Sequence, residues 1–502
     1  MNAVRLLPAP PEGVPLAVPI TAGSALPPGA AADGFAGRAG QACLLNRPDG
    51  RTMLVGLGPA ATPEAAETAG ALSAARMLAE PRLALDARGL DPVAAAAFVL
   101  GAAQRSWRYA ALQTRADPDA QRLAAFDLVV GDIAAVRRAL RAGRAAAEGA
   151  CFARDLVAEP SNTLTPAGFV RHLRGLARFG LELEVIEGAA LRRQGFGGLL
   201  AVGGGSVHPP CLAVLRWPGR IAAAPVAFVG KGITFDTGGI GIKPADRMWE
   251  MRADMAGAAA CAGAMLALAR RRSPAAAVAV MALAENATGG ASYRPSDVLR
   301  SYAGRTVEVV DTDAEGRLVL ADALAFAAAR FRPRAMIDLA TLTGSIVTAL
   351  GHERAGLFGN DDALARQVED AGAAVGEPVW RMPIGAAHRA DLDSDIADLR
   401  HCVPGRMQPD ACHAAAFLRE FVSDIPWAHL DIAGMEAREE ADDRHAAGPT
   451  GFGVRLLDRL VAARFESVMT GGGLTGGLNH AIKQRVRAGG VSGGERILLE
   501  RR

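Results

Sequence analysis

The chain has 502 residues, more than one ordinary hydrophobic core supports, so we expect two domains. Half of its residues are hydrophobic and 22% are charged, a balance that excludes an intrinsically disordered chain. The formal net charge is only +2, which argues against a protein that grips nucleic acid or anionic lipid through its overall charge.

No segment predicts a membrane span or an export signal. The longest apolar run, 255–269, is mostly Ala and Gly and too short to cross a bilayer. The N-terminal segment is broken by prolines and lacks the apolar core of a signal peptide. The six cysteines form no CxxC pair and have no metal-knuckle spacing, so we expect reduced, mostly buried thiols. These features predict a cytoplasmic protein without a membrane partner.

The first 131 residues alternate short apolar runs with helical patterns. The apolar runs are 42–45, 53–57 and 126–130, and the helical patterns cover 62–78 and 92–103. This alternation predicts a small N-terminal α/β domain over 1–131, and it holds no cluster of chemically active side chains.

An arginine-rich helical pattern then covers 132–157 and ends before Glu159-Pro160, because proline disfavours helix at the residue before it. We interpret it as a helix that connects the first domain to a larger catalytic domain over 158–465. Residues 466–502 begin with a glycine-rich stretch and end in a basic segment, which predicts a mobile tail, with or without a role of its own.

The larger domain repeats a strand–helix rhythm. Its predicted strands are 226–229, 277–284, 307–310 and 335–339, and its predicted helices are 253–271 and 318–329. Such alternation predicts an α/β fold with a mostly parallel central sheet covered by helices on both faces. Ligands bind beyond the carboxyl ends of the strands in such sheets, and two acidic loops fall there, so we expect them to form one site.

Lysine is rare in this chain, which has 55 basic residues but only three lysines. Lys231 and Lys243 lie twelve residues apart in VGKGITFDTGGIGIKP, and the third, Lys483, lies near the C-terminus. An amine can lose its proton and offer a lone pair to a metal, whereas a guanidinium stays charged. The alternative is that these lysines survive by chance on the surface.

Carboxylates crowd around the same loops. Asp236 follows Lys231, Asp254 precedes an Ala-rich helix, and the second loop holds Asp311, Asp313 and Glu315. Asp313, Glu315 and Arg317 alternate, so an extended loop would project them on one side. Acids packed this closely need cations among them, and hard oxygen ligands suit Mg or Mn, with Zn also possible. Four or five carboxylates suit two ions better than one. Each acid taken alone could instead cap a helix or a strand.

Six motifs resemble the leucyl aminopeptidases, also called cytosol aminopeptidases. They occur in family order over roughly 155–465 and are VGKGITFDTGGIGIKP, MRADMAGAA, DTDAEGRLVLADAL, DLATLTG, WAHLDIAG and GPTG. The resemblance implies a metal-dependent aminopeptidase that releases an N-terminal residue, preferably Leu or another apolar residue, from peptides. It also implies a homohexamer.

The resemblance implies roles for individual residues. Two divalent ions, Mn²⁺ or Zn²⁺, would be held by Lys231, Asp236, Asp254, Asp313 and Glu315, with Lys231 acting through its neutral amine. The catalytic residues would be Lys243, which stabilises the oxyanion of the tetrahedral intermediate, and Arg317, which holds a small anion such as bicarbonate. The substrate-binding residues would be Met251 and Pro449 near the first side chain, and Thr341, Leu342 and Gly344 along the backbone.

The chain departs from the family pattern in two places. Position 311 is Asp where the family usually has Asn, which adds a negative charge beside the metals. The segment GRMQPDACHAAAFL, which contains the altered loop 405–412, differs from the family's style and is one residue longer. This segment usually approaches the substrate, so it bears on side-chain preference.

Other functions have less support. A DNA-binding accessory or regulatory hexamer is the main alternative; near-neutral charge argues against it, and a gel-shift titration across salt would decide. A metallophosphoesterase could use the same carboxylates, but a lysine ligand suits it less. The chain lacks HExxH, and His429 is best interpreted as a hydrogen-bonded core histidine.

Overall fold

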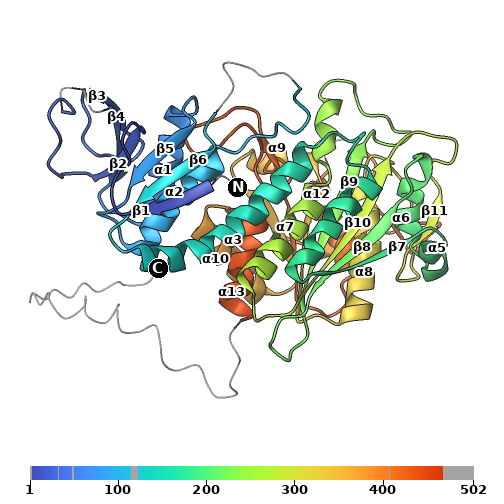
Figure 1. Cartoon of the computed structure of the whole chain (residues 1–502). Coiled ribbons are helices and arrows are strands. Elements are labelled where there is room, and N and C mark those ends of the chain that lie inside the picture. Colours follow the sequence, from blue (N-terminus) through green and yellow to red (C-terminus); the bar gives the residue numbers. More distant parts are fainter. Residues whose placement is uncertain (1–2, 32, 48–49, 115–121, 406–407, 467–502) are drawn as a thin grey trace, which may run out of the picture. The chain divides into compact units, whose positions relative to one another are not determined.

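The computed structural model describes residues 3–31, 33–47, 50–114, 122–405 and 408–466 (Figure 1). One unit of contacts extends through Glu466 and contains two large sheets, one in each half of the chain. The domain boundaries expected from the sequence therefore stay a prediction. The tail expected over 466–502 lies outside the described residues, apart from Glu466.

The N-terminal sheet has six strands in the order β1-β6-β5-β2-β4-β3. The strands are β1 Ala3–Leu7, β2 Leu16–Thr21, β3 Ala42–Arg47, β4 Gly50–Gly58, β5 Arg82–Asp86 and β6 Ala125–Val129. Two helices, α1 Pro63–Arg76 and α2 Pro92–Arg105, pack on its core. Both begin with proline after a side-chain cap, Thr62 or Asp91, which explains why their starts were predictable.

The helix expected over 132–157 is present as α3, Ile133–Ala158, capped by the side chain of Asp132. Its first half contributes Val136 and Leu140 to the N-terminal core, and its second half contributes Leu156 and Val157 to the core of the larger sheet. One helix therefore contributes to both cores.

The larger sheet has eight strands in the order β15-β14-β17-β13-β9-β10-β8-β7. They are β7 Glu182–Glu187, β8 Cys211–Trp217, β9 Val226–Asp236, β10 Ala277–Asn286, β13 Ala335–Ala340, β14 Ala355–Gly359, β15 Val379–Arg381 and β17 Trp427–Asp431. The four central strands β17, β13, β9 and β10 run parallel, and antiparallel pairs flank them on both sides. The predicted mostly parallel sheet is confirmed.

Helices cover both faces of this sheet, as predicted. In β9, Val226 and Phe228 belong to one core, while Ala227 and Val229 belong to the other. The first core is completed by α3, α4 Pro166–Arg174, α7 Ala256–Arg271, α10 Asp362–Val375 and α13 Val454–Arg464. The second is completed by α5 Ala189–Gln194, α6 Gly197–Val202, α8 Glu315–Phe331 and α12 Asp410–Arg419. Figure 1 shows α3, α7, α10 and α13 together, with α8 behind the sheet.

The remaining elements are short. They are the 3₁₀ helices η1 Gly175–Phe179, η2 Gly203–Gly205 and η3 Met248–Ala253, the helices α9 Gly344–Leu350 and α11 Ala386–Ala390, and five strands in two small sheets: β11 Val298–Arg300, β12 Thr306–Glu308, β16 Leu399–Arg400, β18 Ala437–Arg438 and β19 Gly448–Pro449. None of the described helices has the length and apolar character needed to cross a membrane.

Two local predictions were wrong. The strand expected over 307–310 is β12, which pairs with β11 and β16 in a separate three-stranded sheet. An apolar run predicts a strand but carries no information on which sheet it joins. The helix expected from 318 begins at Glu315, so Glu315 and Arg317 lie on a helical turn and not in an extended loop.

Candidate active site

A bulge in β9 brings Lys231 and Asp236 to the same face of the sheet. Residues five apart in a regular strand point to opposite faces. Here two residues of β9 lie between Ile233 and Asp236, where β10 has one residue between their partners Ala284 and Asn286. The extra residue shifts the alternation of side chains along β9 by one position, so the two predicted metal ligands lie on the same face of the sheet. Contrary to the prediction, Lys231 lies within the strand and not after its end.

Lys231 is buried among oxygen atoms. Its Nζ lies 2.8 Å from Asp254 Oδ1 and 2.8 Å from Glu315 Oε1, and it donates to the carbonyl oxygen of Thr341 at 2.8 Å. Burial lowers the pKa of Lys231, but the carboxylates of Asp254, Glu315 and Asp236 outweigh burial and raise it. Among the protein groups alone, the amine is therefore a stable ammonium.

Lys243 pairs with two other acids of the same site. Its Nζ lies 2.8 Å from Asp236 Oδ2 and also pairs with Asp313. Burial lowers the pKa of Lys243, and Asp236 and Asp313 raise it by more. The loop that carries Lys243 turns at Gly238 and Gly239, whose φ angles of +86° and +66° favour glycine.

Four carboxylates, Asp236, Asp254, Asp313 and Glu315, form what we call the carboxylate cluster. Ligand oxygens of Asp236, Asp313 and Glu315 lie within 4.8 Å of one another. Burial raises the pKa of Asp254 and of Glu315 even though Lys231 opposes it, and it raises the pKa of Asp313 to about 7 with help from Asp236. Four acids facing two ammonium groups leave the cluster short of positive charge.

This cluster fits divalent cations. Within the described part of the chain, the buried oxygens Asp254 Oδ2 and Glu315 Oε2 have no hydrogen-bond partner. Buried carboxylate oxygens without donors are costly unless a cation completes them. The structure thus brings together all five predicted metal ligands. Lys231 would have to lose its proton to act as one of them.

Asn286 was missed by the sequence analysis. This fully buried residue ends β10 and donates to Asp236 Oδ1 at 2.7 Å and to the carbonyl oxygen of Thr312 at 3.0 Å. Thr312 also accepts from the amide of Gly241 and donates to the carbonyl oxygen of Gly238. These bonds fasten the two acidic loops together. The signal in the sequence was that Asn286, an amide side chain, follows the predicted strand 277–284.

Arg317 lies on α8, two residues after Glu315, with 2% of its side chain exposed. Its Nη1 donates to the carbonyl oxygen of His401 at 3.0 Å, and its Nη2 donates to Asp410 Oδ1 at 2.8 Å. Burial and the charge of Arg317 lower the pKa of His401 to about 4, so His401 is neutral and can accept from the amide of Val310. A free anion at Nη2 does not fit, because Asp410 holds that position.

The residues predicted to bind substrate divide into two groups. Thr341 joins the cluster directly, because its Oγ1 donates to Asp254 Oδ1 at 2.7 Å. The amide of Leu342 donates to Asp431 Oδ1 at 3.0 Å, and Gly344 begins α9. Met251 lies in η3, close before Asp254 in the chain, and is partly buried. The buried Asp431, which positions this backbone segment, was not identified from the sequence.

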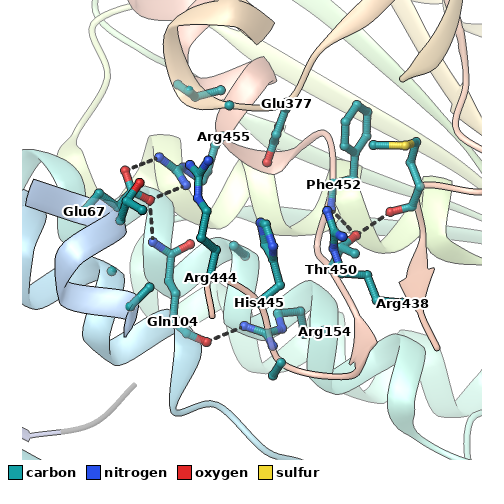
Figure 2. A pocket seen from close by; sticks show the side chains of 18 of the residues that line it. Glu67, Gln104, Arg154, Glu377, Arg438, Arg444, His445, Thr450, Phe452 and Arg455 are labelled. Atoms are coloured by element: carbon teal, nitrogen blue, oxygen red, sulfur yellow. Dashed lines mark hydrogen bonds and ion pairs between the residues drawn. The ribbon is translucent and has the colours of Figure 1, made fainter. Parts of the chain in front are cut away.

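Pro449, the fifth predicted substrate residue, lines a separate cavity of about 210 Å³, which we call the helix cavity (Figure 2). Its walls come from α1, α2, α3, α10 and the start of α13, and no member of the carboxylate cluster lines it. Figure 2 shows Glu67 facing Arg455, an ion pair with N–O distances of 2.7 and 2.9 Å. Arg154 Nε donates to the carbonyl oxygen of Pro449 at 2.9 Å.

Two sequence expectations outside the site are confirmed. His429 is buried, with its Nδ1 2.6 Å from Asp338 Oδ1, which makes it a hydrogen-bonded core histidine. All six cysteines are free and buried.

Comparison with known proteins agrees with this geometry. The family model described as "Cytosol aminopeptidase family, catalytic domain" matches residues 151–458. The chain is 43% identical over 452 residues to a probable cytosol aminopeptidase of Methylobacterium radiotolerans, covering 87% of this chain and 89% of the relative. It is 44% identical over 442 residues to one of Gluconobacter oxydans, covering 86% and 90%.

Solved structures of similar fold point to the same family. The bottromycin maturation enzyme BotP in complex with Mn is similar, with a TM-score of 0.82 and 37% identity over 89% of this chain and 99% of that one. A tomato leucine aminopeptidase mutant has a TM-score of 0.81 and 29% identity, covering 92% and 97%. The span matched by the family model contains the whole carboxylate cluster, both lysines and Arg317. The chain therefore belongs to the cytosol aminopeptidase family and is a peptidase that depends on a divalent metal.

Proposed function

We propose that this protein releases Leu or another apolar residue from the N-terminus of peptides, using two divalent ions, Mn²⁺ or Zn²⁺. The observation that carries the proposal is the carboxylate cluster, in which four acids face two lysines and two buried oxygens have no donor within the described residues. Two ions would supply the missing positive charge.

The ions would be held by five side chains: Lys231, Asp236, Asp254, Asp313 and Glu315. When bound, such ions make water nucleophilic near neutral pH and polarise a carbonyl group. Lys231 is the residue that must change its protonation state to take part. The carbonyl oxygen of Thr341, which accepts from Lys231, keeps the amine directed into the cluster.

Lys243 would remain an ammonium. With its side chain 20% exposed, it is the more accessible of the two lysines, and it can face both the cluster and the substrate. A fixed positive charge at this place stabilises the oxyanion that forms when water adds to the scissile carbonyl. Arg317 is the second residue that we propose for catalysis, as the buried cation that fixes an anionic group next to the metal ligands.

The segment Thr341–Gly344 would hold the substrate backbone, with Met251 near the first side chain. Pro449 lines the helix cavity, apart from the carboxylate cluster, so we do not place it at the substrate. The support is positional: Thr341 contacts Asp254, and the amide of Leu342 is fixed by Asp431. The preference for an apolar residue rests on the family resemblance.

The test is hydrolysis of Leu-p-nitroanilide and of a panel of dipeptides, with N-acetylated peptides as matched controls. We expect activity that Mn²⁺ stimulates, that requires a free amino group, and that Lys243→Ala and Arg317→Ala abolish. Full activity in metal-stripped protein, or equal cleavage of the acetylated peptides, would overturn the proposal.

The homohexamer and the cytoplasmic location stay predictions that rest on the resemblance. Sedimentation velocity tests the first, and a species of six chains is the expected result.

A further inference from the structure

The guanidinium of Arg317 has one full negative charge in direct contact. Its side chain is 2% exposed, and within the described residues it forms an ion pair with Asp410, Nη2 to Oδ1 at 2.8 Å. The other partner is a neutral carbonyl oxygen, that of His401. A cation buried this deeply requires a counter-charge, because burial without one costs several kcal/mol.

Asp410 is held in place by its own helix. It is the first residue of α12, where the positive end of the helix dipole favours a carboxylate. The next amide, that of Ala411, donates to Ser345 Oγ at 2.9 Å, and Ser345 lies directly after the proposed substrate segment, near the start of α9. Two helix starts therefore fix the carboxylate against Arg317, and 37% of the Asp410 side chain stays exposed.

We propose that Asp410 is the anion that Arg317 holds during catalysis, so that this peptidase needs no bicarbonate or other free anion. The proposal rests on the peptidase function proposed above and is an alternative to the bicarbonate expected at Arg317. A tethered carboxylate pairs with the guanidinium without losing translational freedom, whereas a free anion must lose it. A second anion on the same guanidinium would also be repelled by Asp410.

The altered segment GRMQPDACHAAAFL supplies this carboxylate. Its departure from the family style therefore acts on Arg317 and not only on side-chain preference. Arg317 Nε has no hydrogen-bond partner among the described residues, so the guanidinium keeps one spare donor. The alternative to be tested is therefore that a free anion binds at Nε, beside Asp410.

The experiment measures anion binding and activity on metal-loaded protein, at constant ionic strength and in CO₂-depleted buffer. The variants are Asp410→Ala and, as a matched control, Asp362→Ala. Asp362 is likewise the first residue of its helix and pairs with an arginine, Arg381, but it is 81% exposed. Sodium formate and sodium bicarbonate are the probes, and thermal unfolding and Leu-p-nitroanilide hydrolysis are the readouts.

We expect formate to raise the unfolding temperature of Asp410→Ala and to leave the wild type and Asp362→Ala unchanged. We also expect Asp410→Ala to lose roughly 10²-fold in kcat, as for one preorganised electrostatic contact, and to regain most of it with formate or bicarbonate. Rescue of this kind would not follow from a purely structural role. If Asp410→Ala does not fold, Asp410→Asn keeps the volume without the charge and replaces it.

The proposal is overturned if the wild type loses activity on CO₂ depletion, or if formate stabilises the wild type as much as Asp410→Ala. The unfolding readout needs no peptidase activity. Formate stabilisation confined to Asp410→Ala, with no hydrolysis by any variant, would therefore leave the anion assignment standing and remove the peptidase function.

Discussion

The carboxylate cluster and the helix cavity both gather charged side chains, and their carboxylates find hydrogen-bond donors in different ways. In the helix cavity, Glu67 accepts two bonds from Arg455, and Glu377 Oε2 accepts from the amides of Gly453 and Leu456. In the carboxylate cluster, Asp254 and Glu315 each keep one buried oxygen without a donor in the described structure.

This difference separates acids that serve the fold from acids that serve a ligand. Glu67 joins α1 to α13, and Glu377 caps the start of α13, so the protein itself completes both. The cluster is left for cations to complete. Four predictions test this distinction, from the largest expected effect to the smallest.

The strongest test exchanges one carboxylate of each kind for an amide. Glu315→Gln removes a charge that we expect a metal to need, so metal affinity should fall by more than the roughly 10–100-fold typical of residues that only orient a ligand. Activity should fall with it. Glu377→Gln is the matched control and should bind metal as the wild type does. Metal analysis after dialysis measures both, and a metal-replete Glu315→Gln would contradict the distinction.

The two lysines should respond differently to arginine. Lys231→Arg should lose metal and nearly all activity, because a guanidinium offers no lone pair. Lys243→Arg should keep its metal and lose roughly 10²–10³-fold in kcat, since the bulkier cation misplaces the charge at the oxyanion. Metal content and kcat are measured separately. If both variants keep metal, Lys231 is not a ligand.

Gly316→Ala should weaken metal binding without weakening the fold. A Cβ at this position would lie 2.7–2.8 Å from the Lys231 side chain, closer than real contacts allow. Alanine is otherwise favoured over glycine in a helix by about 1 kcal/mol. We expect a fall of roughly 10-fold in metal affinity by calorimetry, similar to the loss of an orienting residue. Gly175→Ala, which has open space around it, is the control; equal behaviour of the two variants would refute the steric argument.

The prediction with no expected effect on metal binding concerns pH and Glu377. Burial raises the pKa of Glu377 to about 7 from its ordinary 4.5, so the folded state holds the proton more tightly than the unfolded state. Its contribution to stability is therefore full below about pH 4.5 and is lost as pH rises towards 7, at about 1.4 kcal/mol per pH unit and about 3 kcal/mol at most. Unfolding free energies of Glu377→Gln and the wild type should diverge in the variant's favour over this range. A constant difference would show that Glu377 does not titrate there.

The sequence alone predicted most of the fold. The capped helices α1, α2 and α3 and the buried strands β9, β10 and β13 follow from local patterns. The position of β12 in a separate sheet could not be predicted, because a local strand pattern does not show which other strands it pairs with.

The site was predictable in its chemistry and less so in its geometry. All members of the carboxylate cluster were identified by residue type and motif. The bulge in β9 that places Asp236 beside Lys231 was not, because an extra residue in one strand is visible only against its neighbour. Three further residues were missed because each acts through a partner that is distant in sequence. Asn286 contacts Asp236, and His401 and Asp410 contact Arg317.

The central claim is that the carboxylate cluster holds two ions and that hydrolysis depends on them. The most direct measurement is a titration of metal-stripped protein with Mn²⁺, in which bound ions per chain and Leu-p-nitroanilide hydrolysis are followed on the same samples. Our account predicts two ions per chain at saturation, with activity appearing as they bind. Full hydrolysis before any ion is added would contradict it. So would Glu315→Gln binding as many Mn²⁺ ions per chain as the wild type, because the ions would then not lie at this cluster.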